Sequence, residues 1–168
     1  MSTPPSQTYL ARTFDDGRYD WARARRVRRR AVLAEAVLIA ALVAATLVAA
    51  TGSDRSTPSF VVLAVGLVAF VPLHSLLNLG IRGLFDRDDR SLDEHQQRLR
   101  ERSFLAMTRP ATALHLLAWV GAAALAAGTE QLAPALYLGF LLWFTAGLLA
   151  YWHLAWSAPD EPVDDLDA

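Results

Sequence analysis

Residues 81–109, IRGLFDRDDRSLDEHQQRLRERSFLAMTR, form the charged segment around which the rest of the chain is arranged. From Arg82 to Arg109 this connector carries seven Arg and six Asp or Glu residues, and two long apolar runs lie on each side of it. A charged connector between two pairs of membrane-length runs determines which side of a bilayer every other segment must occupy.

The apolar residues of this 168-residue chain are grouped in blocks, and they make up 54% of it. Grouping of this kind is typical of membrane spans rather than of a soluble core. We place the four spans at residues 31–51, 58–81, 110–128 and 132–156. The first is 21 residues long and covers about 30 Å as a helix, the thickness of the hydrocarbon layer. The sequence therefore predicts an all-α integral membrane four-helix bundle made of two hairpins, residues 31–81 and 110–156.

The remaining segments are polar. Residues 1–30 are predicted to form a basic cytoplasmic arm, flexible over residues 1–20, and residues 157–168 an acidic disordered tail. The connector, residues 82–109, is predicted to be an amphipathic cytoplasmic helix. The spacing of Ser91 and Glu94 fits a capping box, which predicts a helix start at Leu92. Its apolar stripe would be Leu92, Leu99 and Ala106, and Arg109 before Pro110 predicts a bend or break.

The distribution of arginine predicts the orientation. Fifteen Arg lie in residues 1–30 and 82–109, and only Arg55 lies in an opposite loop. Because basic residues stay inside, both termini are predicted to be cytoplasmic, in a bacterial inner membrane. Arg29-Arg30-Ala31 is similar to a twin-arginine export signal, but no small-x-small cleavage site follows, so we predict a retained span. The predicted contacts with anionic headgroups and the interface are Arg23, Arg25, Arg26, Arg28, Arg29, Arg30, Trp152 and Trp156.

Small residues recur every four positions in two of the spans. Span one has Ala36, Ala40 and Ala44, and span three has Ala118, Ala122 and Ala126. Such ladders allow helix backbones to approach closely, so we expect these two spans to make the tightest contacts, within the chain, with a protein partner or between copies in a homo-oligomer. An Ala-rich sequence also produces such ladders by chance.

Four ionisable side chains lie in the inner third of the predicted spans: Glu35, His74, His115 and His153. Ionisable groups inside a membrane usually face the bundle interior and are candidate functional sites. Three interpretations remain open. Glu35 and the imidazoles could be structural, bonding across helices. Glu35 could be a titrating carboxylate with His74 or His115 as proton relay. His74, His115 and His153, with Glu35, could hold a metal or haem, although no H-x3-H or E-x2-H pair occurs.

The sequence excludes several kinds of chemistry and contains no motif for several others. The chain has no Cys, which excludes disulfides, thiolate metal ligands and Cys nucleophiles. It contains no Gly-rich phosphate loop, G-x-S-x-G or H-E-x-x-H motif. His95, in the connector, is expected to be solvated. The Arg cluster next to a span is typical of lipid contact, and no nucleic-acid partner and no cofactor are predicted.

The two halves share a pattern of a basic segment, a small-residue helix, a short turn and a bulkier helix, which indicates a parallel tandem repeat. Each half resembles the 2TM membrane-hairpin domain, through Arg109, His115-Leu116, Gly66 and His74, whereas Glu35 departs from its pattern. The segment LDEHQQRLRERSF is similar to the LDExQxxLRxR segment of uncharacterised multi-pass proteins of GC-rich bacteria. These resemblances imply a membrane fold and transfer no activity.

The sequence thus favours a small non-enzymatic polytopic inner-membrane protein, an accessory or scaffold component that presents its charged cytoplasmic segments to partners. The alternative is a small proton-coupled transporter that uses Glu35 with His74 or His115. A metal or haem protein is the second alternative.

Overall fold

A computed structural model of the chain describes residues 13–14, 16–51 and 57–159, and all regular structure within them is helical. Its long helices are α3 (Arg25–Thr51), α4 (Thr57–Gly80), α5 (Glu94–Thr129) and α6 (Leu132–Ser157), and its short ones are η1 (Gly17–Tyr19), α2 (Asp20–Arg23) and η2 (Asp89–Ser91). Each of the four long helices is long and apolar enough to cross a membrane. This finding confirms the predicted all-α bundle with four membrane-length segments.

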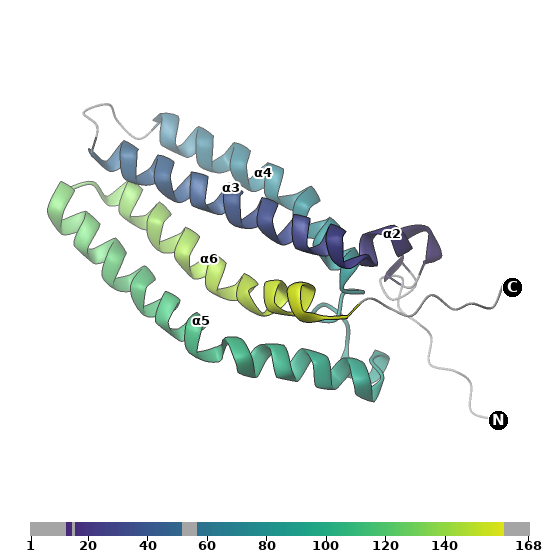
Figure 1. Cartoon of the computed structure of the whole chain (residues 1–168). Coiled ribbons are helices and arrows are strands. Elements are labelled where there is room, and N and C mark those ends of the chain that lie inside the picture. The colour runs from purple at the N-terminus through teal and green to yellow at the C-terminus, as the bar shows by residue number, and fades with distance from the viewer. Residues whose placement is uncertain (1–12, 15, 52–56, 160–168) are drawn as a thin grey trace, which may run out of the picture.

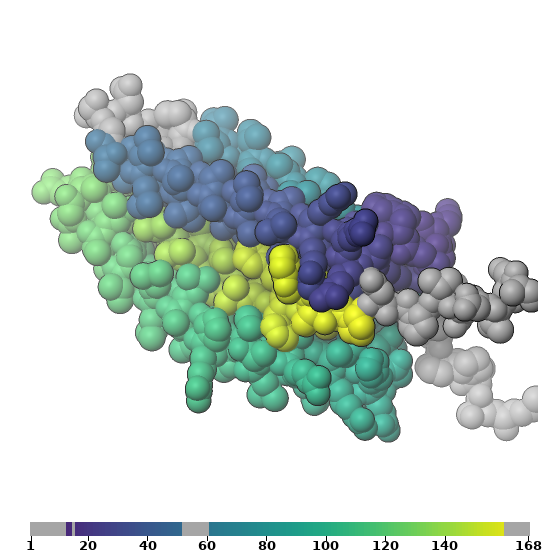
Figure 2. Space-filling view, in the orientation of Figure 1, coloured from purple at the N-terminus to yellow at the C-terminus, as the bar shows by residue number. Residues whose placement is uncertain are grey.

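Helix α6 is the central element of the bundle. It packs along α5 on one side and along α3 on the other, while α4 packs mainly on α3 (Figure 1). In the space-filling view, α6 lies between α3 and α5 (Figure 2). The two helices with alanine ladders, α3 and α5, barely touch each other. The small-residue spans therefore do not form the tight pair with each other within the chain; each packs on the bulkier α6 instead.

One alanine ladder does make a close contact, and its partner is a glycine of α6. A Cβ added to Gly139 would lie 3.2 Å from the Cβ of Ala122 and 3.5 Å from the carbonyl oxygen of Ala118. Ala118 itself is buried. Small residues on both sides thus allow α5 and α6 to approach closely, which is how membrane helices gain packing energy.

The outward faces of the long helices are apolar. Exposed large apolar side chains include Val37, Val48, Val68, Leu116, Trp119, Val120 and Trp143. A water-soluble bundle would place polar residues on these faces. The exposed apolar surface is the arrangement expected of helices that face lipid.

Helix α5 is continuous through Pro110, so of the predicted bend or break at Arg109 the structure shows no break. Its 36 residues correspond to about 54 Å, well beyond the thickness of a hydrocarbon layer. Proline is tolerated inside membrane helices because neighbouring helices support the backbone. The ribbon of α5 bends along its length (Figure 1).

The start and the inward face of α5 also differ from the prediction. Asp93, not Ser91, is the N-cap, and Asp93 and Gln96 form the capping box. Leu92 is buried and Leu99 packs against the core, but Ala106 is exposed and Ser103 is buried in its place. Ser103 follows Leu99 by four residues, close to one helical turn, so both side chains lie on the same face of α5. The predicted stripe used steps of seven residues, and such steps drift off that face in a straight α-helix.

The predicted flexible arm is ordered over part of its length. Phe14 is buried, and a Cβ added to Gly83 would overlap its ring. Gly83 also has φ +59°, a conformation that residues with a side chain rarely adopt. The segment around Phe14 is therefore fixed against the turn that follows α4. The predicted turn at 52–57 and the acidic tail lie largely outside the described residues.

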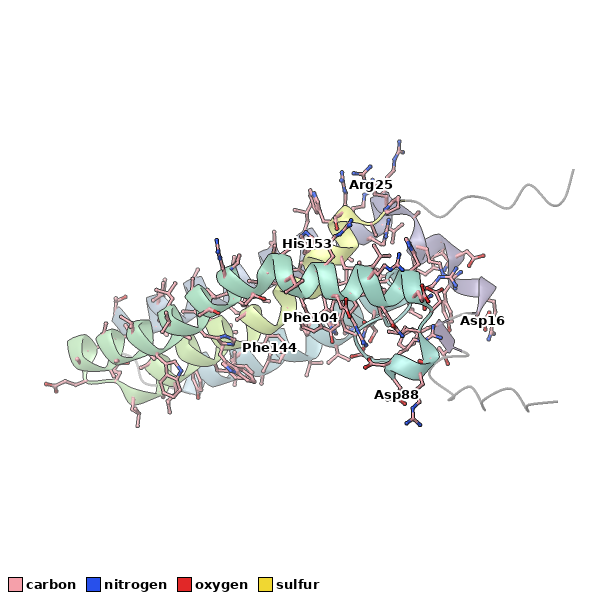
Figure 3. All side chains as sticks on the ribbon, turned by 90° about the horizontal axis from the view of Figure 1, so that it is seen from below. Asp16, Arg25, Asp88, Phe104, Phe144 and His153 are labelled. Atoms are coloured by element: carbon pink, nitrogen blue, oxygen red, sulfur yellow. The ribbon has the colours of Figure 1, made fainter. Side chains whose placement is uncertain are left out.

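Five segments meet at one end of the bundle: α2, the start of α3, the end of α4 with its following turns, the start of α5 and the end of α6 (Figure 1). Asp16, Arg25 and Asp88 lie toward this end, and Phe144 lies farther along the bundle (Figure 3). We call it the charged end.

Candidate functional site

Glu35 is the most deeply buried ionisable group at the candidate site. Its exposed fraction is 0%, and its neighbours come from two other helices. The indole Nε1 of Trp152 on α6 donates a hydrogen bond to Oε2 of Glu35 at 2.6 Å. The Nδ1 atom of His74 on α4 lies 3.3 Å from Oε1. One carboxylate thus connects α3, α4 and α6.

The position of Glu35 follows from the helical period of α3. The buried face of α3 includes Ala31, Glu35, Ile39, Leu42 and Thr46, spaced three or four residues apart. Glu35 therefore occupies a core position of the helix. A buried carboxylate is costly without partners, and the indole N–H of Trp152 supplies one hydrogen-bond donor.

His74 is held between two aromatic rings. Its ring stacks on Phe70 with centroids 5.1 Å apart, and it contacts Tyr151 at 5.2 Å. Oε1 of Glu35 and Nδ1 of His74 are both buried, and neither atom makes a hydrogen bond within the described residues. Their approach at 3.3 Å is therefore a close contact between a carboxylate and an imidazole in the core of the bundle.

Tyr151 extends this polar group toward the charged end. Its hydroxyl donates to Oδ1 of Asp86 at 3.1 Å, and Asn78 donates to the other carboxylate oxygen of Asp86. Asp86 is exposed. Between His74 and Tyr151 there is ring contact but no hydrogen bond, so the path from Glu35 to Asp86 is interrupted at that step.

His153 belongs to a separate contact. Its Nδ1 lies 3.1 Å from the hydroxyl oxygen of Ser103 on α5, which is 2% exposed. His115 is half-buried on α5. Among the described residues no three His, Asp or Glu side chains gather as a metal site. The structure thus brings Glu35 together with His74 and leaves His115 and His153 outside that pair; His95 is exposed, as predicted.

Tyr151, Trp152 and His153 are consecutive residues of α6, and each makes a polar contact with a different part of the chain. Successive helix residues point about 100° apart. Each of the three therefore reaches a different element: Asp86 after α4, Glu35 on α3 and Ser103 on α5. Sequence reasoning missed Tyr151, Asp86 and Ser103. The signal that could have found Tyr151 is the run of three consecutive side chains with polar tips near the C-terminal end of an otherwise apolar helix.

The predicted lipid anchors divide into three groups. Arg25, Arg26 and Arg30 are exposed, as the prediction requires, and Arg29 lies over the Trp156 ring at 4.7 Å. Arg23 and Arg28, 9% and 4% exposed, are instead buried.

The two buried arginines and Trp152 correct the prediction. Arg28 donates to the carbonyls of Ala158 and Pro159 at 2.7 and 3.0 Å, and so holds the residues that directly follow α6. Arg23 pairs with Asp20 and donates to the Phe14 carbonyl at 2.9 Å. Trp152 points into the bundle toward Glu35 rather than to an interface. These three side chains therefore make contacts inside the protein, and the Trp152 indole supplies a donor to a carboxylate that is fully buried.

Comparison with protein-family models, with curated proteins and with solved structures finds no match to this chain. The resemblance to the 2TM hairpin domain and to multi-pass proteins of GC-rich bacteria therefore stays a prediction.

Proposed function

We propose that this chain is a small non-enzymatic polytopic protein of a bacterial inner membrane, with two hairpins in tandem and both termini cytoplasmic. Its role would be that of an accessory or scaffold component whose charged end is presented to cytoplasmic partners. The observation that supports this proposal best is that Glu35 contacts His74 and Trp152 and so joins three helices. Such contacts give the buried ionisable group a structural role.

The exposed charges at the same end support the presenting role. Asp88, Asp89, Arg90, Glu94 and Arg98 are exposed around the start of α5. Glu94 and Arg98 lie at the start of α5, and the other three follow a turn that contacts Phe14 at Gly83 and accepts a hydrogen bond from Tyr151 at Asp86. A rigid, charged surface of mixed sign is suited to selective contact with a protein partner.

The proton-coupled transporter remains a second candidate because Glu35 and His74 lie 3.3 Å apart with both atoms buried. A carboxylate and an imidazole in contact could load and release one proton. His115 does not take part in this contact, so the proposed relay is reduced to two residues. Tyr151 and Asp86 lie between this pair and the charged end, but no hydrogen bond joins His74 to Tyr151, so a transported proton would need another carrier at that step.

The variants Glu35→Gln and Glu35→Ala separate the two candidates. A Gln amide oxygen can accept from Trp152 while its amide N–H donates to His74, so the structural role survives the change to Gln and fails with Ala. For a scaffold, Glu35→Gln should unfold at the same temperature as wild type in detergent, and Glu35→Ala should unfold earlier.

Proton movement is measured in parallel, in proteoliposomes with a trapped pH-sensitive dye. The transporter is the correct function if the wild type dissipates an imposed pH gradient and a normally folded Glu35→Gln variant does not. If the protein is a scaffold, vesicles with the wild type or with Glu35→Gln should dissipate the pH gradient at the same rate as empty vesicles.

A further inference from the structure

Two exposed tryptophans lie midway along the apolar lengths of α5 and α6. Trp119 is nine residues, about 14 Å, from each end of the apolar run 110–128. Trp143 is eleven residues, about 17 Å, from the start of α6 at Leu132. The two residues are 78% and 56% exposed. Tryptophan in membrane proteins is enriched at the water interfaces, where its N–H finds a partner, so two exposed tryptophans at mid-membrane level need an explanation.

One side of the α5–α6 pair can be followed from the contacts of Phe85. Its ring centroid lies 5.1 Å from that of Phe104 on α5 and 4.4 Å from that of Tyr151 on α6, so these two residues lie on the same side of the pair. His115 follows Phe104 by eleven residues, three helical turns, and Trp119 follows His115 by four. His115 and Trp119 therefore lie on this side of α5.

Helix α6 places Gly147 and Trp143 on the same side. Gly147 precedes Tyr151 by four residues, and Trp143 precedes Gly147 by four. Nothing lies within 4 Å of a Cβ added to Gly147. This side of α6 thus has a large exposed ring one helical turn from open space.

The contact between Gly139 and Ala122 sets the relative levels of the two antiparallel helices. Equal steps away from this contact, forward along α6 and backward along α5, reach equal levels. The two tryptophans therefore share one level to within about one residue, and Gly147 shares the next level, one turn nearer the charged end, with His115.

The polar tips on this side have no partner in the described part of the chain. His115, which is half-buried, makes no hydrogen bond, ion pair or ring contact there, and the indole N–H groups of Trp119 and Trp143 make no hydrogen bond there. Lipid chains offer no acceptor, so polar groups that face them cost free energy. Ionisable side chains in membrane spans usually pair with other protein groups. This side of the pair therefore suits a protein surface better than lipid.

We propose that this α5–α6 face, made of His115, Trp119, Ala123, Trp143 and Gly147, is the interface of a homodimer in the membrane. Two copies with the same topology are related by a two-fold axis along the membrane normal, so equivalent residues meet at the same depth. A neutral imidazole both donates and accepts a hydrogen bond, so the two His115 rings can bond to each other beside the open space at Gly147. A second copy thus supplies the partner that His115 lacks.

The inference rests on the proposed function only in that the helices cross a membrane. It does not use the alanine ladders, from which the sequence predicted contacts between copies. It depends instead on unpartnered polar groups that one side of the α5–α6 pair brings together.

The first test is disulfide cross-linking in native membranes, since the chain has no Cys of its own. Ala123→Cys is the main variant, because Ala123 follows Trp119 by one turn. Ala124→Cys is the matched control, because Ala124 is also exposed but points about 100° away from Ala123. After oxidation with copper phenanthroline, Ala123→Cys should give a band of twice the chain mass on a non-reducing gel, and Ala124→Cys should give little or none.

The second test measures the dissociation constant of the dimer in lipid vesicles, by counting fluorophores on single labelled complexes at increasing ratios of protein to lipid. His115→Leu should weaken the dimer about three- to tenfold, the usual effect of losing a hydrogen bond between membrane helices. His115→Gln should retain the wild-type value, because a Gln amide also donates and accepts. Circular dichroism checks that both variants are folded.

Four results would overturn the proposal. Equal cross-linking of Ala123→Cys and Ala124→Cys would indicate random collision, and a cross-linked band of another mass would assign a different partner. Single copies at every ratio of protein to lipid would show that lipid covers this face. Equal dissociation constants for His115→Leu and His115→Gln would remove His115 from the interface. Alkaline carbonate extraction tests membrane placement separately: protein released by carbonate contradicts the proposed function, whereas protein that stays in the membrane as single copies contradicts the dimer alone.

Discussion

Trp152→Phe removes the hydrogen bond to Glu35 while keeping an aromatic ring at the centre of the bundle. The bond is 2.6 Å long and its acceptor is fully buried. After this change Oε2 of Glu35 has no donor in the contacts we describe. A buried acceptor left without a donor destabilises the folded state.

The expected loss of stability follows from the free energies that two kinds of hydrogen bond usually contribute. A hydrogen bond to an ionised partner contributes about 1.5–3 kcal/mol, and interhelical hydrogen bonds in membrane proteins contribute about 0.6 kcal/mol on average and about 1.7 at most. Complete burial of Glu35 favours the upper part of both ranges. We therefore expect a loss of about 2 kcal/mol, roughly a thirtyfold change in the ratio of folded to unfolded protein.

The assay is reversible unfolding in mixed micelles with increasing dodecyl sulfate, followed by near-ultraviolet circular dichroism. Trp143→Phe is the control, because Trp143 is on the same helix and is 56% exposed. We expect Trp143→Phe to change the free energy of unfolding by less than about 0.5 kcal/mol, as is usual for exposed positions. Equal stability of the two variants would refute the structural role of the contact between Trp152 and Glu35.

Two glycines provide further predictions from the same assay. Gly83→Ala should lower the free energy of unfolding by about 2 kcal/mol or more, because φ is +59° and the added Cβ overlaps a buried ring. Gly128→Ala, where nothing lies within 4 Å of the added Cβ, should leave it unchanged or raise it by about 0.5 kcal/mol; a similar loss in both would contradict this. Gly139→Val should cost about 1–3 kcal/mol by separating α5 from α6, and Gly147→Val, in open space, should cost less than half as much; the reverse order would contradict the packing described for α6.

The membrane-length helices could be predicted because the length of an apolar run is itself the physical requirement for spanning lipid. Helix ends were placed within one or two residues where turns were short, as at Thr129 and Leu132. They were misplaced where a helix continues beyond the apolar run, as in α3, which begins at Arg25, and in α5, which continues through Pro110. Hydropathy contains no information about the polar extension of a helix.

The directions of side chains on α6 could not be predicted. This helix is apolar on every face, so the sequence has no polar side that would orient it. Trp152 could equally have faced lipid, and the prediction placed it at an interface. For the same reason the sequence did not indicate that α6 is central. Glu35 and His74 were correctly grouped by depth, but depth alone does not separate His115, which lies on α5 across α6 from Glu35.

The central claim is that the arginine-rich segments share one face of a membrane that four helices cross. The chain contains no Cys, so a single introduced thiol reports its own location. We would place it at Arg90, before α5, or at Glu130, between α5 and α6, and label intact cells with a membrane-impermeant maleimide. The account predicts that Glu130→Cys is labelled in intact cells and Arg90→Cys only after permeabilisation. Labelling of Arg90→Cys in intact cells would contradict it.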